Sequence, residues 1–366
     1  MSDVRDTPVT IILFNRPDKV RALLEVLREV RPRHVLAIAD GPRPGRPADP
    51  ADCSAARDAI AGINWPCHVE HDFAVTNLGP DRRITSGLEW AFGRVDRAIV
   101  VEDDLLPAVD FFTWTARMLD AYAADERVAM VSGHNPLATW GDDDCDHLRT
   151  CRGGHWGWGT WARAWRRVSS VDLSGEPALA RRDIGGVVTE PILAEHLAVY
   201  LAAWRSGRLA ACDVVWNLKQ AVAGLCSVVS PVNLVHNTGV GEGATHTTFP
   251  DDFTAIVPLR PARLRPVPRA AAAEQAAALD RAGVLIELLA RCANPRMAAR
   301  LAQSTRSGAG LPLDDRLRHH LLPFHHPEES LAALAHLIAA GLTTPLIEWL
   351  QDVLRSNASQ RPGVSR

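Results

Sequence analysis

The sequence predicts an α/β fold, in which a mainly parallel sheet is flanked by helices and followed by a helical C-terminal region. Over residues 9–135, short apolar runs rich in β-branched residues alternate with longer segments of helical periodicity. Such alternation is typical of parallel sheets covered on both faces. One apolar run, Ala98 to Val101, ends directly in three carboxylates, Glu102, Asp103 and Asp104.

The elements follow one another in a regular order. Asn-Arg-Pro after the first run and Asp-Gly-Pro after the second end the strands, and Pro17 and Pro80 suit the first position of a helix. We expect strands at 9–14, 34–39, 67–73, 98–101, 128–131, 226–229 and 232–235. We expect helices at 17–30, 51–63, 80–92, 110–122, 193–204 and 213–222.

Length and composition bound the class of protein. The 366 residues, 47% of them hydrophobic, suffice for a large core and about two domains. A net charge of −3 makes nucleic acid an unsuitable main partner. Seven scattered cysteines without a CxxC pair indicate reduced thiols, and with no secretory signal or run of ~20 apolar residues the sequence predicts a cytoplasmic protein. Peripheral membrane contact stays open.

The C-terminal part differs in amino-acid composition. Alternating prolines and arginines over residues 258–269 predict a stiff basic linker. Beyond it, Ala/Leu-rich segments predict helices at 270–292, 295–303, 328–340 and 343–355, and the last ten residues are predicted to be disordered. These helices offer a surface for membrane contact or for a homo-oligomer.

The acidic triplet at 102–104 is the first candidate site. Ligands of open α/β sheets bind outside the carboxyl ends of the strands, and a divalent cation relieves the repulsion of neighbouring carboxylates. We interpret Asp104 as the ligand of Mn²⁺ or Mg²⁺, with Glu102 and Asp103 supporting it or holding ribose hydroxyls. The alternative is a solvated acidic turn.

Two groups of loop residues complete a predicted nucleotide site at the same edge. Phe14, Asn15, Arg16 and Asp40 combine an aromatic ring, an amide and a carboxylate, which suit a nucleobase and its ribose; plain turn formation is the alternative. The second group begins a helix, where backbone N–H groups and arginines favour a diphosphate, and comprises Asn77, Gly79, Arg82 and Arg83. A solvated helix face explains it equally well.

Four tryptophans fall within ten residues of the chain, at positions 156, 158, 161 and 165. Indole rings stack on sugar rings and donate to hydroxyls, and they also pack in cores. We assign Trp156 and Trp158 to an acceptor pocket, and Trp161 and Trp165 to the core.

Asp213 and His246 are the remaining candidates. Asp213 suits a general base that deprotonates an acceptor hydroxyl, or simply the N-cap of the helix that follows. His246, in a glycine-rich loop, is a candidate metal ligand, with His236 as its rival; a loop histidine is also commonly just exposed.

These motifs, in this order, resemble those of bacterial GT-A-fold glycosyltransferases, both family-two-like enzymes and the N-acetylglucosaminyltransferase I type with its EDD form of the DXD motif. The resemblance rests on Phe14-Asn15-Arg16-Pro17, Ala39-Asp40-Gly41-Pro42-Arg43, Asn77-Leu78-Gly79, Glu102-Asp103-Asp104, 156–161 and 237–247. It covers residues 8–268. Pro80-Asp81 departs from the small or basic residue expected there, so the arginine that meets the diphosphate stays open.

The resemblance implies a GT-A-type domain over 1–268, with a nucleotide-binding half (8–135) and an acceptor half (136–268), and leaves 269–366 outside it. It implies a divalent metal on Asp104, a nucleotide-sugar donor (UDP-sugar favoured), inverting transfer with Asp213 as base, and a glycan or small-molecule acceptor. Two alternatives remain: a sugar-1-phosphate nucleotidyltransferase, disfavoured because Asn15-Arg16-Pro17 replaces a Gly-rich basic signature, and a non-catalytic carbohydrate-binding or scaffold protein.

Overall fold

The computed structural model describes residues 3–136, 138–140, 144–175, 191–207, 211–239, 257–277, 279–280 and 283. The chain divides into two compact units. Unit 1 holds residues 1–175, 210–239 and 258–277, and unit 2 holds residues 176–209, 240–257 and 278–366. In unit 2 the described helix is α7 (Pro191–Arg205). The predicted helices beyond residue 292 and the predicted disordered tail lie outside the described residues.

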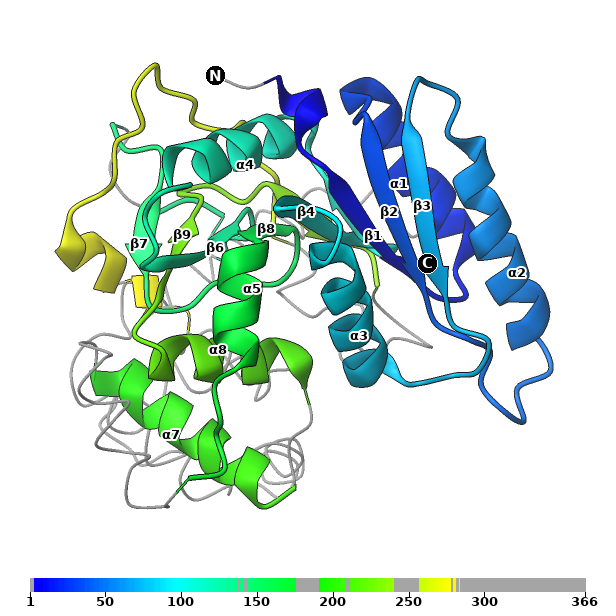
Figure 1. Cartoon of the computed structure of the whole chain (residues 1–366). Coiled ribbons are helices and arrows are strands. Elements are labelled where there is room, and N and C mark those ends of the chain that lie inside the picture. The colour runs from blue at the N-terminus through cyan, green and yellow to red at the C-terminus, as the bar shows by residue number, and fades with distance from the viewer. Residues whose placement is uncertain are drawn as a thin grey trace, which may run out of the picture. The chain divides into compact units, whose positions relative to one another are not determined.

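Unit 1 is built on an eight-stranded mixed sheet in the order β3-β2-β1-β4-β8-β6-β9-β7 (Figure 1). The strands are β1 (Val9–Leu13), β2 (His34–Ala39), β3 (His68–Phe73), β4 (Arg97–Glu102), β6 (Val128–Ser132), β7 (Leu148–Thr150), β8 (Trp158–Trp161) and β9 (Cys226–Val229). A separate antiparallel pair joins β5 (Leu105–Pro107) to β10 (Val235–Asn237). The prediction of an α/β fold with a mainly parallel sheet is confirmed.

Helices cover both faces of the sheet. The helix α1 (Pro17–Val30) contacts α2 (Asp49–Ala59) and α4 (Val109–Ala121), whereas α3 (Pro80–Phe92), α5 (Ala162–Ser169) and α8 (Cys212–Val222) contact one another (Figure 1). Short 3₁₀ turns lie at Val4–Asp6 and Ile60–Gly62. The core lies between the layers: Ile11, Leu36 and Val100 are fully buried. Among the described helices, none has both the length and the hydropathy of a membrane span.

The order of the strands creates a switch point between β1 and β4. The chain runs from β1 to β2 and β3 on one side, then returns to place β4 on the other side of β1, all parallel. The chain after β1 continues to β2 on one side, whereas the chain after β4 continues to β6 on the other side. A crevice at the carboxyl ends of such strands is where α/β proteins bind ligands.

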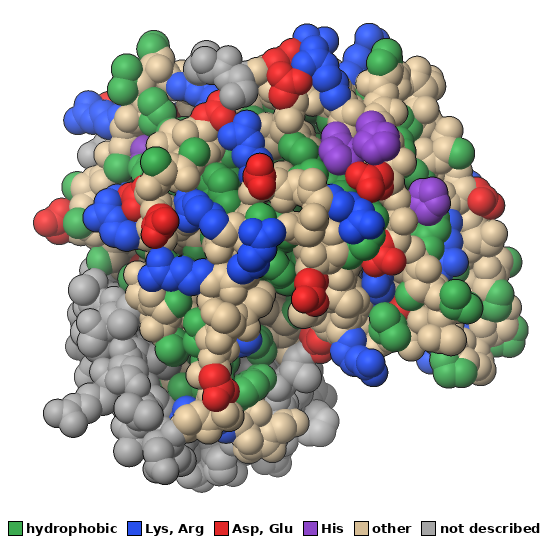
Figure 2. Space-filling view, in the orientation of Figure 1, with side chains coloured by type: hydrophobic (Ala, Val, Ile, Leu, Met, Phe, Trp, Pro, Cys, Tyr) green, Lys and Arg blue, Asp and Glu red, His purple; other side chains and the backbone are tan. Residues whose placement is uncertain are grey.

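The outer strand β3 differs from the central strands because none of its side chains is buried. Its charged side chains form ion pairs with other elements, and Asp72 pairs with Arg83 of α3. Histidine and carboxylate side chains gather on the exposed face over β2 and β3 (Figure 2). Polar side chains on an edge strand discourage pairing with another chain.

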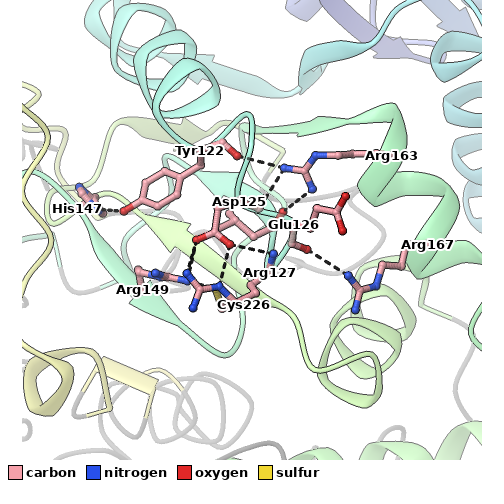
Figure 3. A network of polar contacts seen from close by, with 10 residues as sticks. Tyr122, Asp125, Glu126, Arg127, His147, Arg149, Arg163, Arg167 and Cys226 are labelled. Carbon is pink, nitrogen blue, oxygen red and sulfur yellow. Dashed lines mark hydrogen bonds and ion pairs between the residues drawn. The ribbon is translucent and has the colours of Figure 1, made fainter.

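The turn after α4 is anchored by a polar network (Figure 3). Arg163 of α5 donates to the carbonyl oxygens of Tyr122, Asp125 and Val128 at 3.1, 3.1 and 3.3 Å. Asp125 in turn forms ion pairs with Arg127 at 2.8 Å and with Arg149 of β7 at 3.4 Å. The network thus ties α5 and the end of the sheet to the turn between α4 and β6.

Several predictions about residues 135–270 were wrong. The sequence predicted no strand between residues 131 and 226, yet Trp158–Trp161 forms β8, which runs antiparallel between β4 and β6. Residues 258–269 are not a free linker: the backbone N–H groups of Arg260, Ala262 and Arg269 donate to Asn233, Asp110 and Asp146. This segment is therefore docked on unit 1, and its prolines remove donors where none are needed.

Candidate functional site

The acidic triplet lies at the switch point of the sheet. Ile12 of β1 is in register with Glu102 of β4, so the residues that follow each strand leave the sheet side by side. The Asp103 N–H donates to the Ile12 carbonyl at 2.8 Å, and the Phe14 N–H donates to Asp103 Oδ2 at 2.9 Å. The sequence placed these residues at one edge, and the structure brings them into contact.

Arg16 forms the ion pairs with this site. Its Nη1 donates to Asp104 Oδ2 at 2.6 Å and to Asp103 Oδ1 at 3.3 Å. The Asp103 side chain is buried and has both oxygens engaged, whereas Asp104 Oδ1 has no donor within the described residues. Asp103 therefore positions the loop after β1, and Asp104 keeps an oxygen for a further partner.

The site carries more negative charge than Arg16 neutralises. Burial, with the nearby charges of Asp104, Asp103 and Asp213, raises the pKa of Glu102 to about 8. Burial raises the pKa of Asp103 to about 6, although Arg16 opposes the shift. Each shift means that the folded protein favours the uncharged carboxyl, because burial and the neighbouring carboxylates disfavour the charged form.

Asp213 is not the helix N-cap that the sequence left open. The N-cap of α8 is Ala211, and its side chain makes no capping bond. The Cys212 N–H instead donates to Asp81 Oδ1 at 2.8 Å, so Asp81 of α3 caps α8. The exposed Asp213 therefore does not cap the helix. Its negative charge acts to raise the pKa values of Glu102 and His155.

Asp40 has a different task from the ribose contact that was predicted. Its Oδ1 accepts the N–H groups of Gly41 and Leu78 at 2.8 Å each, and its Oδ2 accepts the Gly79 N–H and Asn77 Nδ2 at 3.0 Å each. Four donors fill the lone pairs of a carboxylate. Asp40 is therefore a positioning residue that folds the 77–79 loop, in which Gly79 has a φ of +80°.

Neighbours that the sequence analysis missed hold Phe14 and Asn15. Arg43 lies over the Phe14 ring, 5.2 Å from its centroid. The buried Asp49 accepts from Arg43 Nε at 2.7 Å and from Asn15 Nδ2 at 3.0 Å, and the bond from Arg43 lowers its pKa well below the usual range. The only signal in the sequence was Arg43 in the Asp-Gly-Pro-Arg turn.

The two predicted diphosphate arginines differ. Arg83 is buried and donates to the Asp72 carbonyl at 2.9 Å and its carboxylate at 2.5 Å, and to Ser86 at 3.1 Å. It therefore ties α3 to β3, and its engagement argues against a role with an anionic ligand. Arg82 is exposed on the first turn of α3.

The segment after β10 closes over Asp104. The N–H and the hydroxyl of Thr238 donate to the Asp104 carbonyl at 2.7 and 2.8 Å, and Lys19 donates to Thr238. A Cβ on Gly239 would lie 2.2 Å from Asp104 Oδ2, so a larger residue here would displace the Asp104 carboxylate. The half-buried His236 lies on β10, where burial lowers its pKa, while His246 lies outside the described residues. Sequence reasoning missed Lys19.

The tryptophans separate differently from the prediction. Trp161 and Trp165 are buried, as predicted, but Trp158 is only 4% exposed and packs on Trp216, which corrects its assignment to an acceptor pocket. Trp156 is half-buried, with its ring centroid 4.7 Å from that of His134. His155, which the sequence analysis did not single out, has a buried Nε2 with no hydrogen-bond partner among the described residues.

The donor set at 102–104 fits a hard divalent cation. Within the described residues, the three carboxylates do not converge as a three-ligand cluster. Mg²⁺ and Mn²⁺ are commonly held by one or two carboxylates, with water and substrate phosphates completing the shell. Asp104 Oδ1 suits such a cation, and a nearby cation would favour the charged form of Glu102. No known protein-family model matches the sequence, and no curated protein matches it.

Proposed function

We propose that the chain is a metal-dependent inverting glycosyltransferase of GT-A type, which moves a sugar from a nucleotide-diphosphate donor to an acceptor hydroxyl. One observation carries the proposal: three consecutive carboxylates, two of them paired with Arg16 among the described residues, lie at the switch point between the parallel strands β1 and β4. Ligands of such sheets bind there, and the excess negative charge favours a cation.

Asp104 is the proposed protein ligand of that cation. A divalent ion bound by Asp104 would supply Lewis-acid neutralisation of the departing nucleoside diphosphate. Asp103, fixed by the Phe14 N–H and Arg16, keeps the loop after β1 in place. Phe14, Asn15 and Arg16 border the nucleotide, and the loop 77–79, folded by Asp40, is offered to the diphosphate.

Asp213 is the proposed general base. It is exposed, it has no capping duty, and its charge acts on Glu102, so it lies within electrostatic range of the acidic triplet. It takes the proton of the acceptor hydroxyl as that oxygen forms its bond to the anomeric carbon. The bond from the anomeric carbon to the diphosphate oxygen breaks on the opposite face, so the configuration inverts. Trp156 remains the proposed contact of the acceptor.

The decisive experiment measures thermal stability of the full chain with UDP-, GDP-, TDP- and CMP-sugars, with and without Mn²⁺. A metal-dependent rise in melting temperature with one nucleotide class is expected. Asp104→Ala should abolish that rise and the transfer reaction, while Asp18→Ala, which changes an exposed carboxylate of α1, should leave both unchanged.

Three outcomes contradict the proposal. An Asp104→Ala variant with full activity removes the metal assignment. If no nucleotide-sugar raises the melting temperature with either Mn²⁺ or Mg²⁺, the chain does not bind this class of donor. The carbohydrate-binding or scaffold alternative then remains. Turnover that depends on pyrophosphate identifies a nucleotidyltransferase instead.

A further inference from the structure

A second group of ligand-type side chains lies at the opposite end of the parallel strands. His34, His68 and Glu70 each offer one atom, and these atoms all lie within 4.8 Å of one another. Both imidazoles face the same carboxylate oxygen: Glu70 Oε1 is 3.0 Å from His34 Nε2 and 3.5 Å from His68 Nε2. The two rings are 4.9 Å apart.

The strands themselves hold these residues in place. His34 of β2 and His68 of β3 are partners in the parallel register, and Glu70 follows His68 by two positions, so all three side chains lie on one face. They stand near the beginnings of their strands, whereas the acidic triplet follows the end of β4. The two groups are therefore separate sites. Histidines gather beside a carboxylate over β2 and β3 in Figure 2.

We propose that His34, His68 and Glu70 bind one divalent transition-metal ion of the Zn²⁺ class. Two imidazoles and a carboxylate are a ligand set for Zn²⁺, Ni²⁺ or Cu²⁺ and not for Mg²⁺ or Ca²⁺, which prefer oxygen. The side chain of His68 is 70% exposed, so water can complete the tetrahedron from the solvent side.

Arg94 orients the carboxylate without occupying the ligand atom. Its Nε donates to Glu70 Oε2 at 3.1 Å, which leaves Oε1 directed at the histidines. Arg94 is itself held over the Trp90 ring at 4.4 Å. Ligating carboxylates and histidines are commonly fixed by such outer hydrogen bonds. A bound ion would add a cross-link between the exposed edge strand β3 and its neighbour β2.

The test is calorimetric titration of ZnCl₂ into the full chain, freed of metal by a chelator and carrying no polyhistidine tag. One site per chain is expected. His68→Gln should weaken it by at least about 100-fold, because even the loss of an outer-shell partner costs about 10–100-fold. His68 is exposed, so the variant should fold normally, which its circular dichroism checks.

Two matched control variants distinguish zinc binding at this site from zinc binding by other thiols and imidazoles. His71→Gln removes an exposed histidine on the other face of the same strand, and Cys67→Ser removes the neighbouring thiol; both should retain the wild-type affinity. Co²⁺ bound to the wild type should give visible d–d absorption that His34→Gln and His68→Gln lose. Equal affinity in His68→Gln and wild type, or equal losses in His71→Gln, overturns the proposal.

The experiment also distinguishes this site from the proposed catalytic one. Asp104→Ala should bind Zn²⁺ at this site as the wild type does, and an excess of Mg²⁺ should not displace it. If Asp104→Ala instead loses the titrated ion, the ion binds at the acidic triplet and the histidine site is refuted.

Discussion

The charge of the acidic triplet should make the metal-free protein less stable as the pH rises. The pKa of Glu102 is about 8 in the folded protein, against 4.5 for an ordinary glutamate. Between these values the folded state binds more protons than the unfolded state, so the free energy of unfolding falls with rising pH. The contribution is fully present below pH 4.5 and is lost as the pH passes through 8.

Glu102→Gln isolates this effect, because glutamine resembles the protonated side chain and cannot ionise. The whole shift corresponds to about 5 kcal/mol at 1.36 kcal/mol per pKa unit. Glu102 is only half-buried, and solvent screens part of its interaction with Asp104 and Asp213. We therefore expect the variant to match the wild type at pH 5 and to exceed its free energy of unfolding by about 1–3 kcal/mol at pH 9.

Urea denaturation in EDTA at pH 5, 7 and 9 measures the difference, provided that the dependence on urea is the same for both proteins. Glu89→Gln, which changes an exposed glutamate of α3, is the control and should follow the wild type at each pH. If the difference in free energy of unfolding between the wild type and Glu102→Gln is the same at pH 9 as at pH 5, the reasoning is refuted, because Glu102 would then ionise freely. Adding Mn²⁺ at pH 9 should narrow the gap.

Three further predictions concern other residues. Asp213→Asn should keep donor binding and lower the rate of turnover about 10²–10⁴-fold, as steady-state kinetics would show, and normal turnover would place the base elsewhere. Asp40→Asn keeps one of the two acceptor oxygens, so its free energy of unfolding, measured by urea denaturation, should be about 1–3 kcal/mol lower. An unchanged midpoint would mean that the 77–79 loop does not depend on this carboxylate. Arg163→Met leaves three backbone carbonyls without their donor and should destabilise by about 1–3 kcal/mol, whereas Arg167→Met, on the exposed side of α5, should change stability by less than about 0.5 kcal/mol; equal losses would contradict the assigned role of Arg163.

The central strands could be predicted from the sequence because their local pattern and their burial agree. Ala98 to Val101 is an unbroken apolar run, and all four residues are buried in β4. The strand β8 could not be predicted in this way. Its residues Trp158, Gly159, Thr160 and Trp161 lack strand alternation, and they form a strand because β4 and β6 each offer an edge on either side. Only the tertiary context specifies it.

The candidate site shows the same division. Phe14, Arg16 and the triplet could be brought together from the sequence, because carboxyl ends of parallel strands share one edge of the sheet. The partners of each polar group could not. Asp81 caps a helix 131 positions further along the chain, and Arg83 is engaged by Asp72 across α3 and β3. Such pairings depend on side-chain directions that spacing along the chain does not encode.

The charge at the switch point is the reason why the proposed function includes a metal. Three carboxylates face one guanidinium, and the raised pKa values of Glu102 and Asp103 show that the balance is unfavourable even without a ligand. A nucleoside diphosphate would bring further negative charge to this edge. Like charges at short range in a partly buried site repel strongly, and Arg16 and Lys19 are the cations that the described residues place near the triplet. In the proposed function a cation on Asp104 would offset that charge, which ties the assignment of the donor to the assignment of the metal.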